Sequence, residues 1–149
     1  MIDEAEKNRR RKLLAIHLGA ENRGDLTGIM ETFAPDAVMH YNGAAFPSAQ
    51  SIGAAHAYLG FSDVRGAFRA PKNVVDRESF TDTDIVVEGR LCGVHQDAFL
   101  GFAPTGRAVE LPFVAIYQFG ADGKLSRERV VMNLGPLNPS YVAAPEGLA

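Results

Sequence analysis

Residues 95–133, HQDAFLGFAPTGRAVELPFVAIYQFGADGKLSRERVVMN, contain the clearest pattern in the chain. Between Arg107 and Phe119 the odd positions are almost all apolar or aromatic, which predicts a strand with one buried face. ADGK then forms a turn and LSRERVVMN a second strand, so the two strands make an antiparallel hairpin. The eleven-residue loop before them, residues 96–106, is long enough to be functional or disordered, and its apolar residues argue against disorder.

The period-two pattern also extends upstream of this loop. NVVDRESF (73–80) and IVVEGRLCGVH (85–95) are two further strands joined by a polar TDTD turn, which completes a four-stranded antiparallel meander. Earlier in the chain, apolar residues recur at helical spacing. The elements expected there are helices at 4–22, 25–34 and 51–64, a short strand at 37–41 and a turn-rich link at 43–49.

This element order predicts the fold class and the domain organisation. Helices followed by consecutive hairpin-linked strands are typical of an α+β fold, in which the helices cover one face of the sheet. We expect three N-terminal helices packed on a strongly curved, mostly antiparallel sheet, in one domain spanning residues 1–149. The segment from about residue 135 has three prolines and no periodicity, so we expect it to be irregular.

Composition and charge exclude several classes of function. The chain has 149 residues, a net charge of −3 and a pI near 5.8, whereas a nucleic-acid-binding surface is normally strongly basic. Cys92 is the only cysteine, so there is no intrachain disulfide, no cysteine-based zinc site and no sign of an oxidising compartment; we expect a cytoplasmic protein. The apolar run LLAI near the N-terminus is too short for a signal peptide or a membrane span.

Three stretches resemble a known family. They are GDLTGIMETFAPDAV (24–38), HQDAFLGFAPTGRAVELP (95–112) and DGKLSRERVVMN (122–133). Together with the element order, they resemble the SnoaL-like polyketide cyclase branch of the nuclear transport factor 2-like superfamily, which includes ketosteroid isomerase. The resemblance covers roughly residues 8–135. It implies a cone-shaped α+β barrel, a homodimer formed through the sheet, a water-poor pocket for a small molecule, and no metal or organic cofactor.

The residues that the resemblance would assign to catalysis are largely replaced. Alignment places His17, Tyr41 and Ala115 where ketosteroid isomerase-like enzymes have a tyrosine, a carboxylate base and a strand acid. Arg90 to Cys92 lacks the carboxylate of the Arg-x-Asp pair of the related epoxide hydrolases. SnoaL-like cyclases carry a general acid/base carboxylate near the end of the last strand, and here Asn133 occupies that position. An amide orients a carbonyl or a water but does not transfer protons at neutral pH.

Histidine and tyrosine remain as candidates for proton transfer. His95, at the mouth of the long loop, and His17, on the first helix, have the residue type suited to acid/base work near neutral pH. Tyr41 and Asn133 would hold a substrate oxygen. Structural alternatives stay open: His95 as a surface residue bonded to its loop, His17 as a half-buried helix residue, and Tyr41 and Asn133 as packing residues.

The orientation of the last strand is undecided from the sequence. Both alternating sets of residues 125–133 mix polar with apolar side chains, and a single bulge would exchange them. If Asn133 points outward, Glu128 becomes the inward carboxylate. We expect His40 and His56 on solvated faces, and we find no His or carboxylate pair at metal-binding spacing, which argues against a metal site.

Apolar residues of the sheet and the loop are the candidates for ligand contact. Those that we expect to line a substrate pocket are Phe33, Phe99, Leu111, Phe113 and Tyr117. The loop would form a hydrophobic rim over the open end of the cone, as a lid or as a dimer arm.

Two functions follow from these observations. The first is a cofactor-independent isomerase, cyclase or lyase that uses acid/base chemistry on a hydrophobic, polyketide- or steroid-like small molecule. The second is a non-catalytic small-molecule binding or association domain that has lost the family carboxylate.

Overall fold

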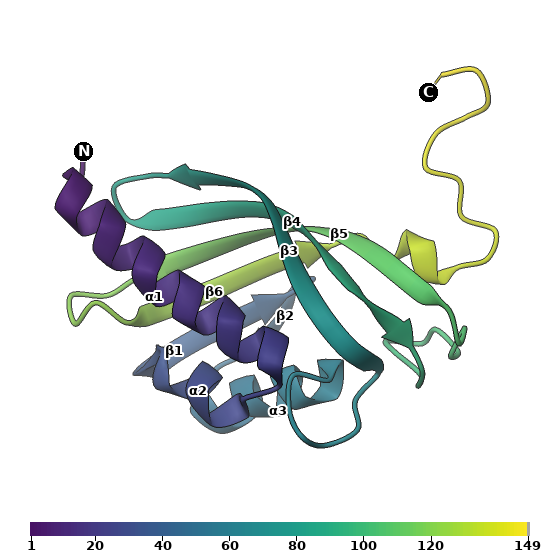
Figure 1. Ribbon diagram of the computed structural model, residues 1–149, viewed down its shortest axis with the longest axis horizontal. Helices are drawn as coiled ribbons and strands as arrows, with labels where there is room; N and C mark the ends of the chain where they lie inside the picture. The colour runs from purple at the N-terminus through teal and green to yellow at the C-terminus, as the bar shows by residue number, and fades with distance from the viewer. Residues whose placement is uncertain (149) are drawn as a thin grey trace.

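The computed structural model of the chain describes residues 1–148, and it combines three α-helices with a six-stranded sheet (Figure 1). The helices are α1 (Glu4–Arg23), α2 (Leu26–Glu31) and α3 (Ala49–Leu59). The strands are β1 (Phe33–Tyr41), β2 (Ala44–Phe46), β3 (Phe68–Phe80), β4 (Asp84–His95), β5 (Ala108–Phe119) and β6 (Leu125–Met132). A short 3-10 helix, Gly135–Leu137, follows β6.

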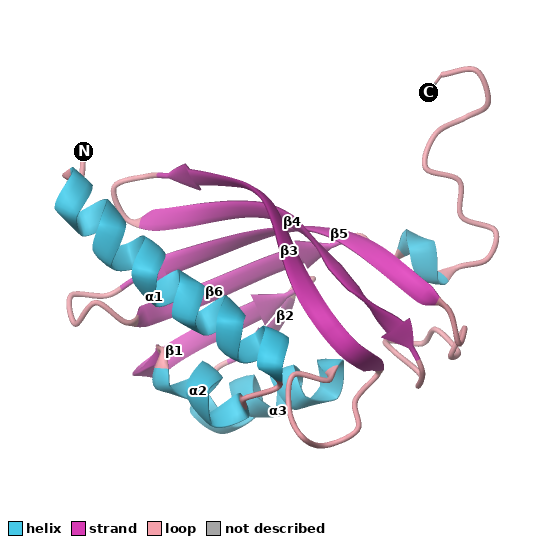
Figure 2. Cartoon of the chain, in the orientation of Figure 1, coloured by secondary structure: helices cyan, strands magenta, loops and turns pink. Residues whose placement is uncertain are grey.

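The sheet confirms the predicted antiparallel meander and adds one parallel pairing. Its strand order is β2-β1-β6-β5-β4-β3, in which β3 to β6 pair antiparallel and β1 pairs parallel with β6. The three helices pack on the sheet, which is curled but not closed, so the expected α+β cone is confirmed as an open one (Figure 2). This parallel pairing places β1, from the N-terminal half of the chain, beside β6, the last strand.

Side-chain caps fix the ends of the helices. The Asp3 carboxylate accepts a hydrogen bond from the Glu6 backbone N–H at the start of α1, and Gly24, in the left-handed region, ends that helix. Asp25 caps α2 in the same way. Helix α3 begins two residues earlier than predicted, because Ser48 is its N-cap and forms a capping box with Ser51.

Several predicted boundaries were wrong, and two prolines explain part of the difference. The second helix was expected to run to residue 34, but α2 ends at Glu31, and Pro35 lies within β1, where the pairing to β6 is irregular. Pro71 lies within β3, an edge strand, at a shift in its register with β4. A proline is tolerated at such positions because no ladder hydrogen bond is lost. The expected link at 43–49 contains β2, and the third helix ends at Leu59 instead of residue 64.

Alternation along β5 confirms the face that was predicted to be inward. Its buried residues are the odd-numbered ones from Val109 to Phe119, and Leu111, Ala115 and Tyr117 are at most 2% exposed. Burial of each large apolar side chain contributes ~1.5–3 kcal/mol. After the 3-10 helix, residues 138–148 contain no further helix or strand, and in Figure 1 they extend away from the sheet. Among residues 1–148, none of the helices is long and apolar enough to cross a membrane.

Candidate functional site

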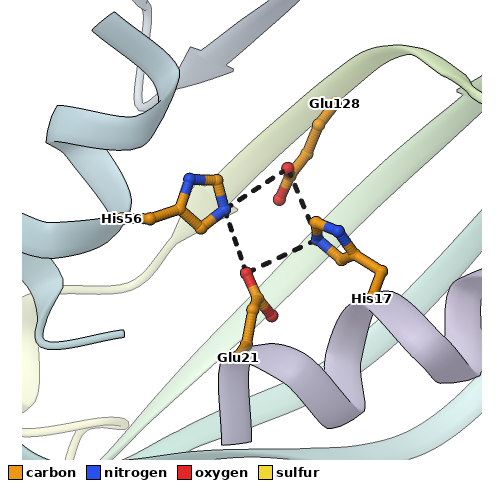
Figure 3. A group of neighbouring side chains, drawn as sticks. All are labelled: His17, Glu21, His56 and Glu128. Carbon is orange, nitrogen blue, oxygen red and sulfur yellow. Dashed lines mark ion pairs between the residues drawn. The ribbon is translucent and has the colours of Figure 1, made fainter. Parts of the chain in front are cut away.

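Four buried ionisable side chains meet between the helices and the sheet, and we call them the tetrad. They are His17 and Glu21 from α1, His56 from α3 and Glu128 from β6 (Figure 3). None of the four side chains is more than 5% exposed. A group of this kind is expensive to bury unless its members pair with one another or with a ligand.

Local structure brings these residues together from distant parts of the sequence. His17 and Glu21 are one helical turn apart on α1, so their side chains share a face. Glu128 points to the inner face of β6, as do Val130 and Met132. His56 lies one turn before the end of α3, on the side that packs against the core.

The distances within the tetrad define one short ion pair, a longer contact between His17 and Glu21, and two still longer contacts to Glu128. His56 Nε2 lies 3.1 Å from Glu21 Oε1, and His17 Nε2 lies 3.5 Å from the same oxygen. Glu128 Oε2 is 3.8 Å from His17 Nε2 and 3.9 Å from His56 Nε2, which is beyond hydrogen-bond distance. Among residues 1–148, Glu128 Oε2 and His17 Nε2 are buried and make no hydrogen bond.

The outer nitrogen of each histidine is held by an acceptor. The Thr32 hydroxyl donates to the Ile29 carbonyl at 2.6 Å, so its oxygen accepts from His17 Nδ1–H at 2.8 Å. His56 Nδ1–H donates to the Ile52 carbonyl at 2.8 Å. Both rings are therefore fixed with Nε2 toward the centre of the tetrad.

Burial and neighbouring charges shift the pKa values of the tetrad residues in different directions. Burial alone would raise the pKa of Glu21, but the nearby His17 and the hydrogen bond that His56 donates outweigh it and lower that pKa well below 4.5. Burial would lower the pKa of His56, but the hydrogen bond that His56 donates to Glu21 and the charges of Glu128 and Glu21 raise it to about 9. Burial, with the charge of Glu21, raises the pKa of Glu128. At neutral pH, His56 and Glu21 are therefore a charged pair.

A cavity, which we call the polar cavity, reaches the tetrad. Its volume is about 30 Å³, and Glu21, His56 and Glu128 contribute polar groups to its wall. The rest of the wall is mainly apolar and aromatic, and includes Tyr41, Phe113, Tyr117 and Leu91. A few convergent polar groups in a largely apolar cleft are typical of a small-molecule site.

A second, apolar pocket of about 200 Å³ adjoins the first and is partly open to solvent. Tyr41 and Leu59 line both spaces, so they form the wall between them. The remaining residues of this apolar pocket are Phe46, Ala54, Ala55, Tyr58, Phe99 and Leu100. An apolar ligand body and a polar reactive end would thus find different surroundings on the two sides of Tyr41.

The long loop contributes the rim of the apolar pocket. Phe99 is 1% exposed and packs against Phe68 and Tyr58, with ring centroids 5.0 and 5.4 Å away. The Tyr58 hydroxyl accepts from the Leu100 backbone N–H at 3.0 Å. The loop is therefore anchored to α3, and Leu100, half exposed, stands at the pocket edge.

The predicted catalytic residues occupy different places. His17 belongs to the tetrad. Tyr41 lines both cavities, and its hydroxyl lies 2.8 Å from Met132 Sδ. His95 is buried and packs against Phe68, and its Nδ1 accepts a hydrogen bond from the Thr105 backbone N–H at 3.3 Å. His95 therefore stabilises the base of the long loop, and it lines neither cavity.

Asn133 lies outside the site. It is exposed, donates to the Tyr141 hydroxyl at 2.8 Å and accepts from the Gly135 backbone N–H at 2.9 Å. Glu128 is the inward carboxylate of β6, because the β5–β6 register shifts at Gln118 and Phe119. The alternative that the sequence left open is thereby decided in favour of Glu128.

The predicted ligand-contact residues divide in a similar way. Phe113 and Tyr117 line the polar cavity, and Phe99 lines the apolar pocket. Leu111 is fully buried in the core. Phe33 packs edge-on against the rings of His17 and His56, with centroids 5.3 and 5.9 Å away. It therefore contacts the two histidines of the tetrad and lines neither cavity.

Sequence reasoning missed half of the tetrad. His56 was expected on a solvated face, which is wrong: it is 2% exposed. Glu21 was not singled out, and the statement that no His or carboxylate pair has metal-binding spacing is also wrong, because His17 and Glu21 are four residues apart on α1. That four-residue spacing on a helix was the signal in the sequence that could have indicated the tetrad. His40, also expected to be solvated, is half-buried.

The curled sheet and the covering helices define a ketosteroid isomerase-like fold of the nuclear transport factor 2-like class. The sequence model of the SnoaL-like domain matches residues 15–128, a segment that contains the whole tetrad. The chain belongs to the SnoaL-like domain family. This family binds small-molecule substrates, and membership supports a small-molecule function of cyclase or isomerase type. A search of curated proteins gave no match.

Solved structures share the fold over nearly the whole chain. AclR from Streptomyces galilaeus, a proposed hydroxylase, is 27% identical, with 86% of this chain and 91% of AclR covered and a TM-score of 0.70. A proposed SnoaL-like polyketide cyclase from Jannaschia sp. CCS1 is 22% identical, with 97% and 99% covered and a TM-score of 0.77. TsrD from Streptomyces laurentii is 19% identical, with 92% and 95% covered and a TM-score of 0.74.

Proposed function

We propose that this protein is an isomerase- or cyclase-type enzyme that moves a proton on a hydrophobic, polyketide- or steroid-like ketone. The observation that carries the proposal is the position of Glu128. Its buried carboxylate has an oxygen without a hydrogen-bond partner in residues 1–148, and it lines a cavity that adjoins an apolar pocket. This assigns to Glu128 the proton transfer that the sequence suggested for His95 or His17.

The environment of Glu128 suits a general base. Burial raises its pKa, which brings the carboxyl group nearer to the pH at which it both accepts and releases a proton. The neighbouring charged pair of His56 and Glu21 keeps its own proton, because the pKa values of these two groups are pushed apart. Proton transfer is therefore assigned to Glu128, the carboxylate of the tetrad whose Oε2 accepts no hydrogen bond in residues 1–148.

Two tyrosines are placed to hold the substrate oxygen. Tyr117 and Tyr41 line the same cavity as Glu128, and burial together with the charge of Glu128 raises the pKa of each phenol, so each stays protonated as a donor. In the proposed step, Glu128 removes a proton from the carbon beside a substrate carbonyl, and a tyrosine hydroxyl donates a hydrogen bond to the developing enolate oxygen. When Glu128 returns the proton to another carbon, the product is an isomer. When the enolate carbon attacks a second carbonyl, Glu128 returns the proton to the alkoxide oxygen that forms, and the product is a ring.

The test follows proton abstraction directly. Chelator-treated protein is incubated in D₂O with a panel of polycyclic and polyketide-like ketones, and deuterium uptake beside the carbonyl is measured by mass spectrometry. We expect Glu128→Gln to slow uptake by about 100-fold or more, the usual contribution of a general base. Glu110→Gln is the matched control, because Glu110 is an exposed carboxylate on the neighbouring strand that pairs with Arg90 at 3.2 Å.

Two outcomes would overturn the proposal. Uptake at the same rate in wild type and Glu128→Gln would exclude Glu128 as the base. Ligand binding, measured by calorimetry, without uptake above the buffer rate for any ketone would favour the second function, a non-catalytic binding domain. Circular dichroism and thermal unfolding of the variant would show that it is folded.

A further inference from the structure

We propose that the tetrad is also a binding site for one divalent transition-metal ion, of which Zn²⁺ is the simplest probe. The ligand atoms of His17, Glu21, His56 and Glu128 all lie within 4.8 Å of one another. Two imidazole nitrogens and two carboxylate oxygens form a mixed N/O donor set that suits zinc and its neighbours, whereas calcium and magnesium prefer oxygen alone.

The distances fit an ion at the centre. Bonds of about 2.05 Å in tetrahedral geometry place neighbouring ligand atoms about 3.3 Å apart. The four contacts between the histidine Nε2 atoms and the glutamate oxygens are 3.1, 3.5, 3.8 and 3.9 Å. The remaining two separations among the four ligand atoms are within 4.8 Å, so side-chain rotations that shorten the widest separation by up to about 1.5 Å bring the four atoms to bonding distance.

The surroundings orient the ligands as in known metal sites. A metal-bound histidine normally donates its other N–H to a carbonyl, hydroxyl or carboxylate, which fixes its tautomer and ring orientation. Here His17 Nδ1–H is held by Thr32 and His56 Nδ1–H by the Ile52 carbonyl, each at 2.8 Å. Glu21 is held in turn, because its second oxygen accepts from the Asn73 side-chain amide at 2.5 Å.

Two unsatisfied atoms are the independent sign of a missing partner. In the part of the chain that the structure describes, His17 Nε2 and Glu128 Oε2 are fully buried, point into the tetrad and have no hydrogen bond. Buried polar groups of this kind are rare, because each costs ~1–3 kcal/mol. A dication bonds to both atoms at once and balances the two carboxylate charges.

The metal-bound form excludes the proton-bound form. His56 Nε2 holds either a proton, which it donates to Glu21, or the metal, and Glu128 cannot remove a substrate proton while it is a ligand. The inference does not rest on the proposed function, because it concerns binding alone. It adds a second state to the same site; only the expectation that metal loading stops proton transfer by Glu128 rests on the proposed function.

The experiment measures binding without turnover. Chelator-treated protein is titrated with Zn²⁺ by calorimetry, and Co²⁺ loading is followed by its visible absorption. We expect one ion per chain, with affinity about 100-fold or more weaker in His17→Gln and Glu128→Gln, since loss of supporting groups alone weakens metal sites ~10–100-fold. His40→Gln is the matched control, a half-buried histidine on β1 outside the tetrad.

The outcomes separate this proposal from the first. Failure of wild type to bind one equivalent of Zn²⁺ or Co²⁺, or equal affinity in His17→Gln and His40→Gln, overturns the metal site. The wild-type titration decides even if a variant fails to fold. Deuterium uptake by metal-free protein that binds no Zn²⁺ would disprove only the metal site, and Zn²⁺ binding without uptake would disprove only the proton-transfer function.

Discussion

Raising the pH from 6.5 to 9.5 should lower the free energy of unfolding by about 3 kcal/mol through His56. Its pKa rises from an ordinary 6.5 to about 9 in the folded chain, and each pKa unit corresponds to about 1.36 kcal/mol. Because the folded pKa lies above the unfolded one, the stabilisation is complete below pH 6.5 and is lost as the pH rises through about 9. Urea unfolding at intervals of half a pH unit measures this decrease.

His56→Gln is the comparison that isolates this contribution. The groups that face His56 are Glu21 and His17 on α1 and Glu128 on β6. The pKa of Glu21 is lowered, so it stays ionised throughout the range. Glu128, whose pKa is raised, adds a decrease of the same sign to both proteins. This decrease is larger in His56→Gln, because the His56 charge that lowers the pKa of Glu128 is removed, so the difference between the two slopes is a lower bound on the share of His56. A flat wild-type profile, or the same slope in His56→Gln, would refute the charged-pair description.

Three further substitutions test the packing. Gly53→Ala in α3 should stabilise the protein by ~0.5–1 kcal/mol in urea unfolding, because the new methyl group meets nothing closer than a sulfur atom at 3.8 Å. Gly89→Ala should destabilise it by ~1–3 kcal/mol or more, because its Cβ would lie 2.5 Å from a β3 carbonyl oxygen and 2.9 Å from the Phe113 ring; unchanged stability would contradict this packing. Tyr58→Phe should speed hydrogen exchange of the Leu100 amide about fivefold while leaving global stability nearly unchanged, since a single hydrogen bond contributes ~1 kcal/mol.

The sequence predicted the elements whose pattern is local. The alternation along β5 identified Phe113 and Tyr117 as inward residues, and both line the polar cavity. The four-stranded meander followed from the turns between its strands. The parallel pairing of β1 with β6 was missed, because it joins segments about ninety residues apart, such as Tyr41 and Val130, without any turn signal.

The site was harder to predict because it depends on packing between elements. His17 was a candidate from its residue type, and Glu128 stayed an alternative, because one irregularity in the β5–β6 register decides which side of β6 faces inward. His56 was missed since α3 is a short helix whose buried side depends on the sheet beneath it. Glu21 looked like an ordinary surface glutamate, and its burial becomes visible only when Asn73 of β3 is placed beside it.

The protonation state of Glu128 tests the central claim most directly. Carbon-13 NMR of the glutamate side-chain carboxyl groups, with Glu128→Gln to assign the resonance, gives the pKa of this group in metal-free protein. We predict a pKa above 4.5 and a change in the resonance when a polycyclic ketone that shows deuterium uptake is added. A Glu128 carboxyl that titrates at or below 4.5 and does not respond to any such ketone would contradict the account.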